Sequence, residues 1–126
     1  MSITEERLKY IVEWLTEKKA DAISVYDLTK ANSYTDYIVV CEGQADQHVR
    51  AMGNYLLEMA KSSHISALSK EGLDYAHWVL LDFGDVIVHI FIPETRTYYM
   101  IDEFFKSCLQ KLEAVESSEA VESNND

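Results

Sequence analysis

Two carboxylates and an imidazole lie close together in one short segment, where they could bind a metal ion. They are Asp82, Asp85 and His89, within the sequence AHWVLLDFGDVIVHIF at 76–91. Carboxylate pairs hold Mg²⁺ in phosphoryl-transfer enzymes, which makes a metal-dependent nucleotidyltransferase using Asp82 and Asp85 the alternative function to test. Asp and Gly also favour tight turns for conformational reasons alone, and the DFG triplet has no kinase motif around it. We therefore favour a turn and predict no catalytic residue, no metal and no cofactor.

The same segment is predicted to form a β-hairpin with two different faces. With its turn centred on Phe83-Gly84, three cross-strand pairs would share one surface: Asp82 with Asp85, Leu80 with Ile87, and Trp78 with His89. The opposite surface is uniformly hydrophobic and is predicted to face the core, with Val79, Leu81, Val86, Val88 and Ile90.

The mixed face of the hairpin has two interpretations. Helices could cover both faces of the sheet and bury Trp78, Leu80, Ile87 and Phe91 as a second core. That reading explains the two carboxylates and the histidine poorly, because buried charges need partners. An aromatic anchor ringed by polar groups is typical of protein interfaces. We therefore predict a partner-binding surface that is open in the free protein.

The remaining elements must hold this hairpin in place. Ser2 and Glu5 match a capping box at the start of a helix. The predicted elements are a helix from about Ile3 to Lys18, strands at Ala22–Leu28 and Thr35–Cys41, a helix from Asp46 to about Ser62, a polar stretch at Ser63–Tyr75, a short strand at Thr97–Tyr99, and a last helix carrying Ile101, Phe104, Phe105 and Leu109. This order implies an α/β fold, with a mixed β-sheet of about five strands packed with helices in a single domain over residues 1–110.

Composition narrows the possible partners and the compartment. The net charge of −11 and the pI of about 4.7 argue against direct binding to nucleic acid or to a membrane surface. The N-terminus is not a signal peptide, and Cys41 and Cys108 resemble reduced thiols, so we expect a cytoplasmic protein. Residues 111–126 are predicted to form a disordered acidic tail, which contains EAVES twice and has no basic residue from Glu113 onward.

In four stretches that include the hairpin, the chain resembles the ribosomal silencing factor family (RsfS, related to plant Iojap). The matching pieces are TDYIVVCEGQADQHVRAM at 35–52, EG at 71–72, WVLLDFGDVIVHIF at 78–91 and PETRTYYMIDEFF at 93–105. The resemblance implies a nucleotidyltransferase-like topology without the catalytic set. Two features depart from the family pattern: Ile92, where many relatives have histidine, and the EAVES tail.

The resemblance also implies a function. Such proteins dock on a basic protein of the large ribosomal subunit, the fourteenth in the usual count, at the face that joins the small subunit. They thereby block subunit association and repress translation when nutrients are short, and dimers are known in the family. Carried over by position, the partner-binding residues would be Trp78, Leu80, Asp82, Asp85, Ile87 and His89, with Asp36 and Tyr37 as weaker candidates.

Overall fold

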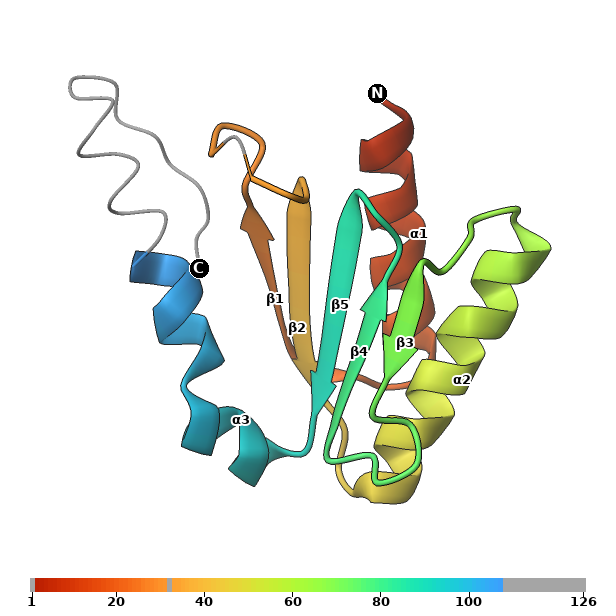
Figure 1. Ribbon diagram of the computed structural model, residues 1–126. Coiled ribbons are helices and arrows are strands. Elements are labelled where there is room, and N and C mark those ends of the chain that lie inside the picture. The colour runs from red at the N-terminus through yellow and green to blue at the C-terminus, as the bar shows by residue number, and fades with distance from the viewer. Residues whose placement is uncertain (1, 32, 108–126) are drawn as a thin grey trace.

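The structure is a computed structural model in which residues 2–31 and 33–107 are described, and a mixed sheet runs through its centre (Figure 1). Leu109, Cys108 and the acidic tail lie outside the described residues. A helical stretch at 101–107 follows the last named element and is called the 101–107 helix below. The elements are α1 (Ile3–Glu17), β1 (Asp21–Asp27), β2 (Tyr37–Glu42), α2 (Asp46–Ser62), β3 (Ser69–Glu71), β4 (Trp78–Asp82), β5 (Val86–Phe91) and α3 (Pro93–Tyr99).

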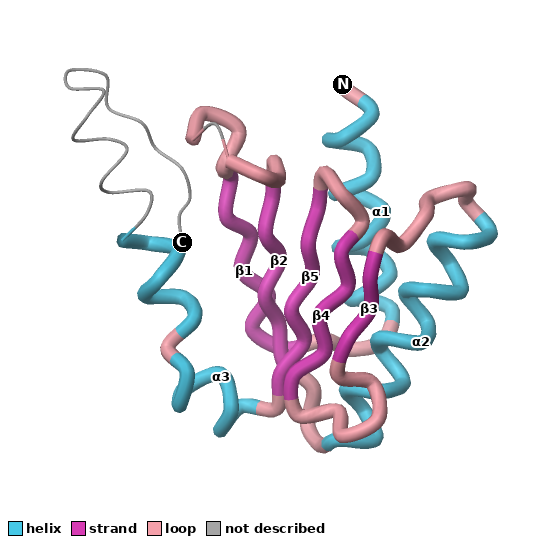
Figure 2. The backbone as a smooth tube through the Cα atoms, in the orientation of Figure 1, coloured by secondary structure: helices cyan, strands magenta, loops and turns pink. Residues whose placement is uncertain are grey.

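The five strands lie in the order β1-β2-β5-β4-β3, which confirms the mixed sheet (Figure 2). The β1–β2, β4–β5 and β3–β4 pairs are antiparallel, whereas β2 and β5 pair in parallel at the centre. Both central strands are almost fully buried, as expected for a sheet covered on both faces. No helix among the described residues is both long and apolar enough to cross a membrane.

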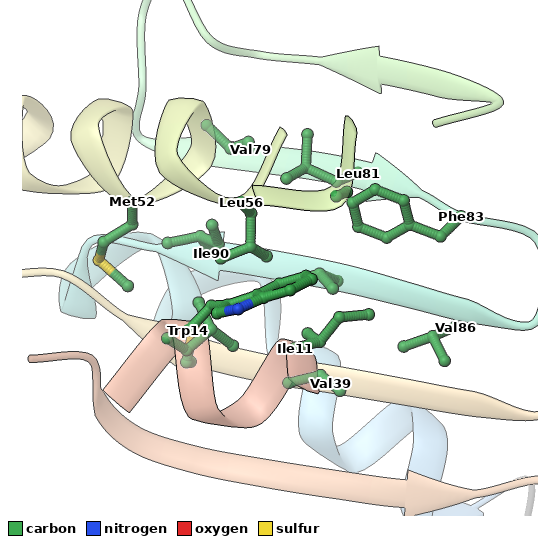
Figure 3. Close-up of a cluster of buried hydrophobic side chains, with 14 of the residues drawn as sticks. Ile11, Trp14, Val39, Met52, Leu56, Val79, Leu81, Phe83, Val86 and Ile90 are labelled. Carbon is green, nitrogen blue, oxygen red and sulfur yellow. The ribbon is translucent and has the colours of Figure 1, made fainter. Parts of the chain in front are cut away.

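Helices α1 and α2 cover one face of the sheet and form the larger core (Figure 3). Helix α1 begins with the predicted capping box, since Glu5 N donates to Ser2 Oγ and Ser2 N donates to Glu5 Oε1. The two helices contribute apolar stripes at helical spacing, which pack on alternate residues of the strands. This core contains Ile11, Trp14, Leu15, Val49, Met52 and Leu56 from the helices and Val39, Val79, Leu81, Val88 and Ile90 from the sheet.

A second, smaller core lies on the other face of the sheet, beneath the 101–107 helix. Its buried members are Tyr26, Leu28, Ile38, Val40, Ile87, Phe91 and Phe105, with Trp78 and Leu80 partly buried against them. The interpretation of two covered faces is therefore right for Ile87 and Phe91. The prediction of an open surface is wrong for this part of the face, because Phe105 reaches it from a distant part of the chain.

The hairpin pairing also differs from the prediction. Phe83 N donates to Val86 O at 2.9 Å, so the turn is centred on Gly84 and Asp85 rather than on Phe83 and Gly84. Gly84 has a φ of 93°, which a glycine adopts without strain in a two-residue turn. The observed pairs are Trp78 with Phe91, Leu80 with His89, and Asp82 with Ile87. Each residue of β4 therefore pairs with a residue of β5 that lies two positions later than predicted. A shift of two positions keeps every side chain on its predicted face of the sheet.

Two element predictions are wrong. The segment Thr97–Tyr99 is the end of helix α3 and not a strand, and Pro93 occupies the first turn of that helix, where its missing N–H costs nothing. The fifth strand is instead β3, in the stretch 63–75 that was read as polar. Its three residues are all exposed, so no alternation of apolar and polar residues marked it.

Candidate partner-binding surface

The predicted site residues are spread along the β4–β5 hairpin and are not gathered at one point. Trp78 begins the strand and Asp82 ends it, about 13 Å away at the usual rise per residue. Trp78, Leu80 and Asp82 are partly exposed, whereas Ile87 and His89 are each only 6% exposed. The structure therefore keeps three of these side chains accessible and places the other two within the second core.

His89 is a buried polar residue that is held by the indole of Trp78. Trp78 Nε1 donates a hydrogen bond to His89 Nδ1 at 3.0 Å, which places the imidazole proton on Nε2. The rings of Phe91 and Phe105 lie 6.1 and 6.0 Å from the imidazole, centroid to centroid. Burial lowers the pKa of His89 to about 4, with the nearby charge of Asp102 acting in the opposite direction. At neutral pH His89 is uncharged and fixes the orientation of Trp78.

Asp82 and Asp85 do not face one another. Asp82 Oδ1 accepts a hydrogen bond from Gly84 N at 2.8 Å, which closes the turn. Asp85 instead reaches helix α1, where its carboxylate accepts a hydrogen bond from Thr4 Oγ1 at 3.0 Å and lies 3.4 Å from Arg7 Nη1. Among the described residues, no group of three or more His, Cys, Asp or Glu side chains could hold a metal ion. The two carboxylates have separate structural roles, which gives no support to the nucleotidyltransferase alternative.

Asp36 and Tyr37 lie at the turn end of the sheet, away from Trp78. The backbone N–H groups of both residues donate to Asp85 O at 3.1 Å. The Tyr37 side chain is 9% exposed and packs with the larger core beneath α1 and α2. Burial raises the pKa of Tyr37, assisted by the neighbouring carboxylates of Asp27 and Glu5. The Tyr37 side chain therefore lies on the opposite face of the sheet from Trp78.

Several exposed aromatic residues gather around Trp78, and the sequence analysis did not predict this grouping. We call it the aromatic patch and define it as Tyr75, Trp78, Tyr98, Tyr99 and Met100. Tyr75, Tyr98 and Tyr99 are 73%, 77% and 54% exposed, and the Tyr99 ring lies 5.0 Å from that of Trp78, centroid to centroid, at a tilt of 45°. The run Tyr98-Tyr99-Met100 was the available signal, because three adjacent large apolar residues cannot all face the core from one short helix.

Arg96 anchors helix α3 and the 101–107 helix to the edge of the sheet. Its Nε and Nη2 donate to the two carboxylate oxygens of Asp102 at 2.8 and 3.0 Å, and its Nη1 donates to Glu42 Oε2 at 3.1 Å and to Ala22 O at 2.8 Å. Tyr26 Oη also donates to Asp102, at 2.6 Å. Burial disfavours the Asp102 carboxylate, but the hydrogen bonds from Arg96 and Tyr26 outweigh it and lower the pKa of Asp102.

Comparison with known proteins places the chain in a family. The protein-family model described as "Ribosomal silencing factor during starvation" matches residues 2–126. The chain belongs to the ribosomal silencing factor family. The match extends through the acidic tail, which we had expected to lie outside the family pattern.

Relatives of the family agree with this assignment in sequence and in fold. The chain is 33% identical over 98 residues to the ribosomal silencing factor RsfS of Bacillus subtilis, across 78% of this chain and 83% of the relative. It is also 33% identical over 100 residues to a mouse protein named "Mitochondrial assembly of ribosomal large subunit protein 1", across 75% of this chain and 43% of that protein. A crystal structure from Chromobacterium violaceum superposes with a TM-score of 0.79 at 31% identity, covering 84% and 88% of the two chains.

Proposed function

We propose that this protein represses translation by docking on the large ribosomal subunit, through a basic ribosomal protein (the fourteenth in the usual count). Bound there, it would occupy the face that meets the small subunit and so prevent the two subunits from joining. The family assignment supports a silencing role, and the name of the mouse relative associates that protein with the large subunit. The observation that carries the docking proposal is the exposed aromatic patch around Trp78.

The aromatic patch has the properties of an interface core. Four aromatic residues and a methionine are grouped at one end of the sheet, and residues of these types are enriched where proteins bind one another. Trp78 is fixed by its hydrogen bond to His89 and by stacking on Phe91, with 5.0 Å between ring centroids. A rigid anchor loses little conformational entropy when a partner binds, so more of the contact energy is available for affinity.

Partly exposed residues of β4 extend the proposed surface. Leu80 adds apolar area, and Asp82 supplies a carboxylate at the far end of the strand. Asp36, at the turn end, would add negative charge at the rim, whereas Asp85 would hold the turn against α1 through Thr4 and Arg7. The buried residues Ile87, His89 and Tyr37 would act by supporting the surface rather than by touching the partner.

The charge of the chain suits a basic partner. A net charge of −11 would attract a basic ribosomal protein over several ångströms and would disfavour contact with the phosphates of ribosomal RNA. Such steering acts mainly on the association rate and weakens as salt shortens the Debye length. We therefore expect association with the large subunit to slow as ionic strength rises.

A sedimentation assay with purified ribosomal subunits tests the proposed function. Excess protein should keep the subunits apart under conditions in which they otherwise re-associate, and it should co-sediment with the large subunit. If the subunits join equally well in its presence, the proposed function is wrong.

A matched pair of tyrosine variants tests the docking surface. Tyr99→Ala removes a ring that packs against Trp78 and should weaken large-subunit binding about tenfold or more, as expected for a central interface residue. Tyr34→Ala is the control, because Tyr34 is 74% exposed and lies outside the aromatic patch. Equal affinities of the two variants would show that the partner binds elsewhere.

A further inference from the structure

The aromatic patch borders a groove that the docking proposal leaves without a defined occupant. Its volume is about 620 Å³, and its walls come from the loop before β4, the start of β4 and helix α3. Figure 2 shows this loop and α3 at the same end of the sheet, although about twenty residues separate them in sequence. The residues that matter for its chemistry are Tyr75, His77, Trp78, Glu94, Tyr98 and Tyr99.

The walls of the groove are rings set at several angles. The Trp78 and Tyr99 rings lie 5.0 Å apart at 45°, and Tyr98 and Tyr99 lie 4.9 Å apart at 89°. On the other side of the groove, Tyr75 and His77 are 4.0 Å apart at 33°. An aromatic ring is negative on its face, so rings turned at different angles around one space favour a cation within it.

The charged side chains around the groove also favour a cation within it. Glu94 is exposed on the first turn of α3 and contributes a carboxylate to the wall, whereas no lysine or arginine in the described part of the chain lines the groove. The cationic Arg96 lies on the same helix but is engaged by Asp102 and Glu42 and lines a different hollow, beside β1. An aromatic space with one carboxylate, and with no basic side chain among its described lining residues, is suited to a guanidinium or an ammonium group.

The groove is held in shape by the backbone around it. Ile92 N donates to His77 O at 3.1 Å, which ties the start of α3 to the loop, and Ala76 N donates to Gly72 O at 2.8 Å within the loop. Gly72 has a φ of 87°, and a Cβ atom there would lie 2.1 Å from Trp78 O. Only glycine lets the loop approach β4 this closely, so the backbone of the loop is held against the start of β4 beside Trp78.

We propose that this groove is an aromatic cage that receives one arginine or lysine side chain of a basic protein partner. The identity of that partner rests on the proposed function, whereas the chemistry of the cage follows from its own residues. The cation lies against the faces of Trp78 and Tyr99, and Glu94 accepts a hydrogen bond from it at the rim. A planar guanidinium stacks on rings better than an ammonium does, so the cage prefers arginine over lysine.

The cage is tested on the full chain by NMR with small probes that carry only the side chain of interest. The probes are N-acetyl-arginine amide, N-acetyl-lysine amide and N-acetyl-citrulline amide, the last being a neutral analogue of arginine with nearly the same shape. We expect the arginine probe to shift the indole N–H signal of Trp78 and to leave that of Trp14 unchanged, because Trp14 is buried in the larger core. Citrulline should bind about threefold to tenfold more weakly than arginine. Equal shifts with arginine and citrulline would overturn the proposal.

Two variants separate the contribution of the carboxylate from that of the rings. Glu94→Gln keeps the shape and removes the charge, and Tyr98→Leu removes an aromatic wall from a position that is 77% exposed. Each should lower the affinity for the arginine probe about threefold or more, whereas Tyr34→Leu should not change it. Unchanged affinity in both cage variants would also overturn the proposal.

Different experimental results would contradict the cage and the proposed function. If the arginine probe binds at Trp78 but the protein does not bind the large subunit, the cage stands and the proposed function is wrong. If the protein binds the large subunit with the same affinity in the wild type and in Glu94→Gln, and the probe does not bind, the proposed function stands and the cage is wrong.

Discussion

The burial of His89 makes the stability of the fold depend on pH in a specific range. In the unfolded chain this imidazole has its ordinary pKa of 6.5, whereas in the folded protein burial lowers the pKa to about 4. Between these values the unfolded state binds the proton and the folded state does not, so stability falls as pH falls. The loss begins near pH 6.5 and is complete near pH 4.

The size of this effect follows from the same two pKa values. A shift of one pKa unit is worth about 1.4 kcal/mol, so the full loss is about 3 kcal/mol. Between pH 7 and pH 5 the linkage relation gives a loss of about 2 kcal/mol from His89 alone. With a typical urea m-value for a chain of this size, the unfolding midpoint should fall by roughly 1 M.

Urea unfolding of His89→Gln, compared with the wild type at pH 7 and pH 5, isolates this contribution. The glutamine side chain offers an oxygen that can accept the Trp78 N–H, but it does not titrate, so the variant should lose about 2 kcal/mol less than the wild type over this range. His64→Gln is the control for the substitution itself, because His64 is exposed in the turn after α2 and is not part of the second core. An equal loss in the wild type and in His89→Gln would refute the reasoning.

Three further substitutions should change stability in directions that calorimetry or urea unfolding can check. Arg96→Ala removes four hydrogen bonds to side chains and one to a backbone carbonyl; because its carboxylate partners are only partly buried, we expect a loss of about 2 to 4 kcal/mol. Gly72→Ala forces a Cβ atom against Trp78 O and should cost about 2 kcal/mol or more, whereas Gly53→Ala, in helix α2 and 2.8 Å from a flexible side-chain end, should cost much less. Ser2→Ala breaks the capping box of α1 and should cost about 1 kcal/mol. A Gly53→Ala variant as unstable as Gly72→Ala, or full stability in either of the other two, would contradict the contacts described.

Local patterns in the sequence were sufficient for most of the fold. The capping box at Ser2 and the apolar stripes of α1 and α2 predicted both helices to within a residue or two. Alternation along β4 and β5 also assigned each side chain to the correct face. That assignment survived an incorrect turn because the pairing moved by two positions, and a two-residue shift preserves the faces.

The remaining errors concern contacts between segments far apart in the chain. The burial of His89 depends on Phe105, and no local pattern shows that a helix sixteen residues later covers this face. Tyr75 and Tyr99 were not linked by the sequence because the short helix that brings them together was read as a strand. The candidate site therefore moved from the middle of the hairpin toward the Trp78 end, where loop, strand and helix converge.

The parallel pairing at the centre of the sheet has a consequence for how the protein folds. The β1–β2 and β4–β5 hairpins each join neighbouring segments, but Tyr37 pairs with Val86, 49 positions later. Closing a loop of this length lowers the entropy of the chain before the stabilising contacts between β2 and β5 have formed. The step that joins the two hairpins should therefore limit the folding rate. Until β5 has been synthesised, the apolar edge of β2 has no neighbour. A nascent chain of this protein therefore leaves this edge of β2 unpaired until Phe91, the last residue of β5, has been made.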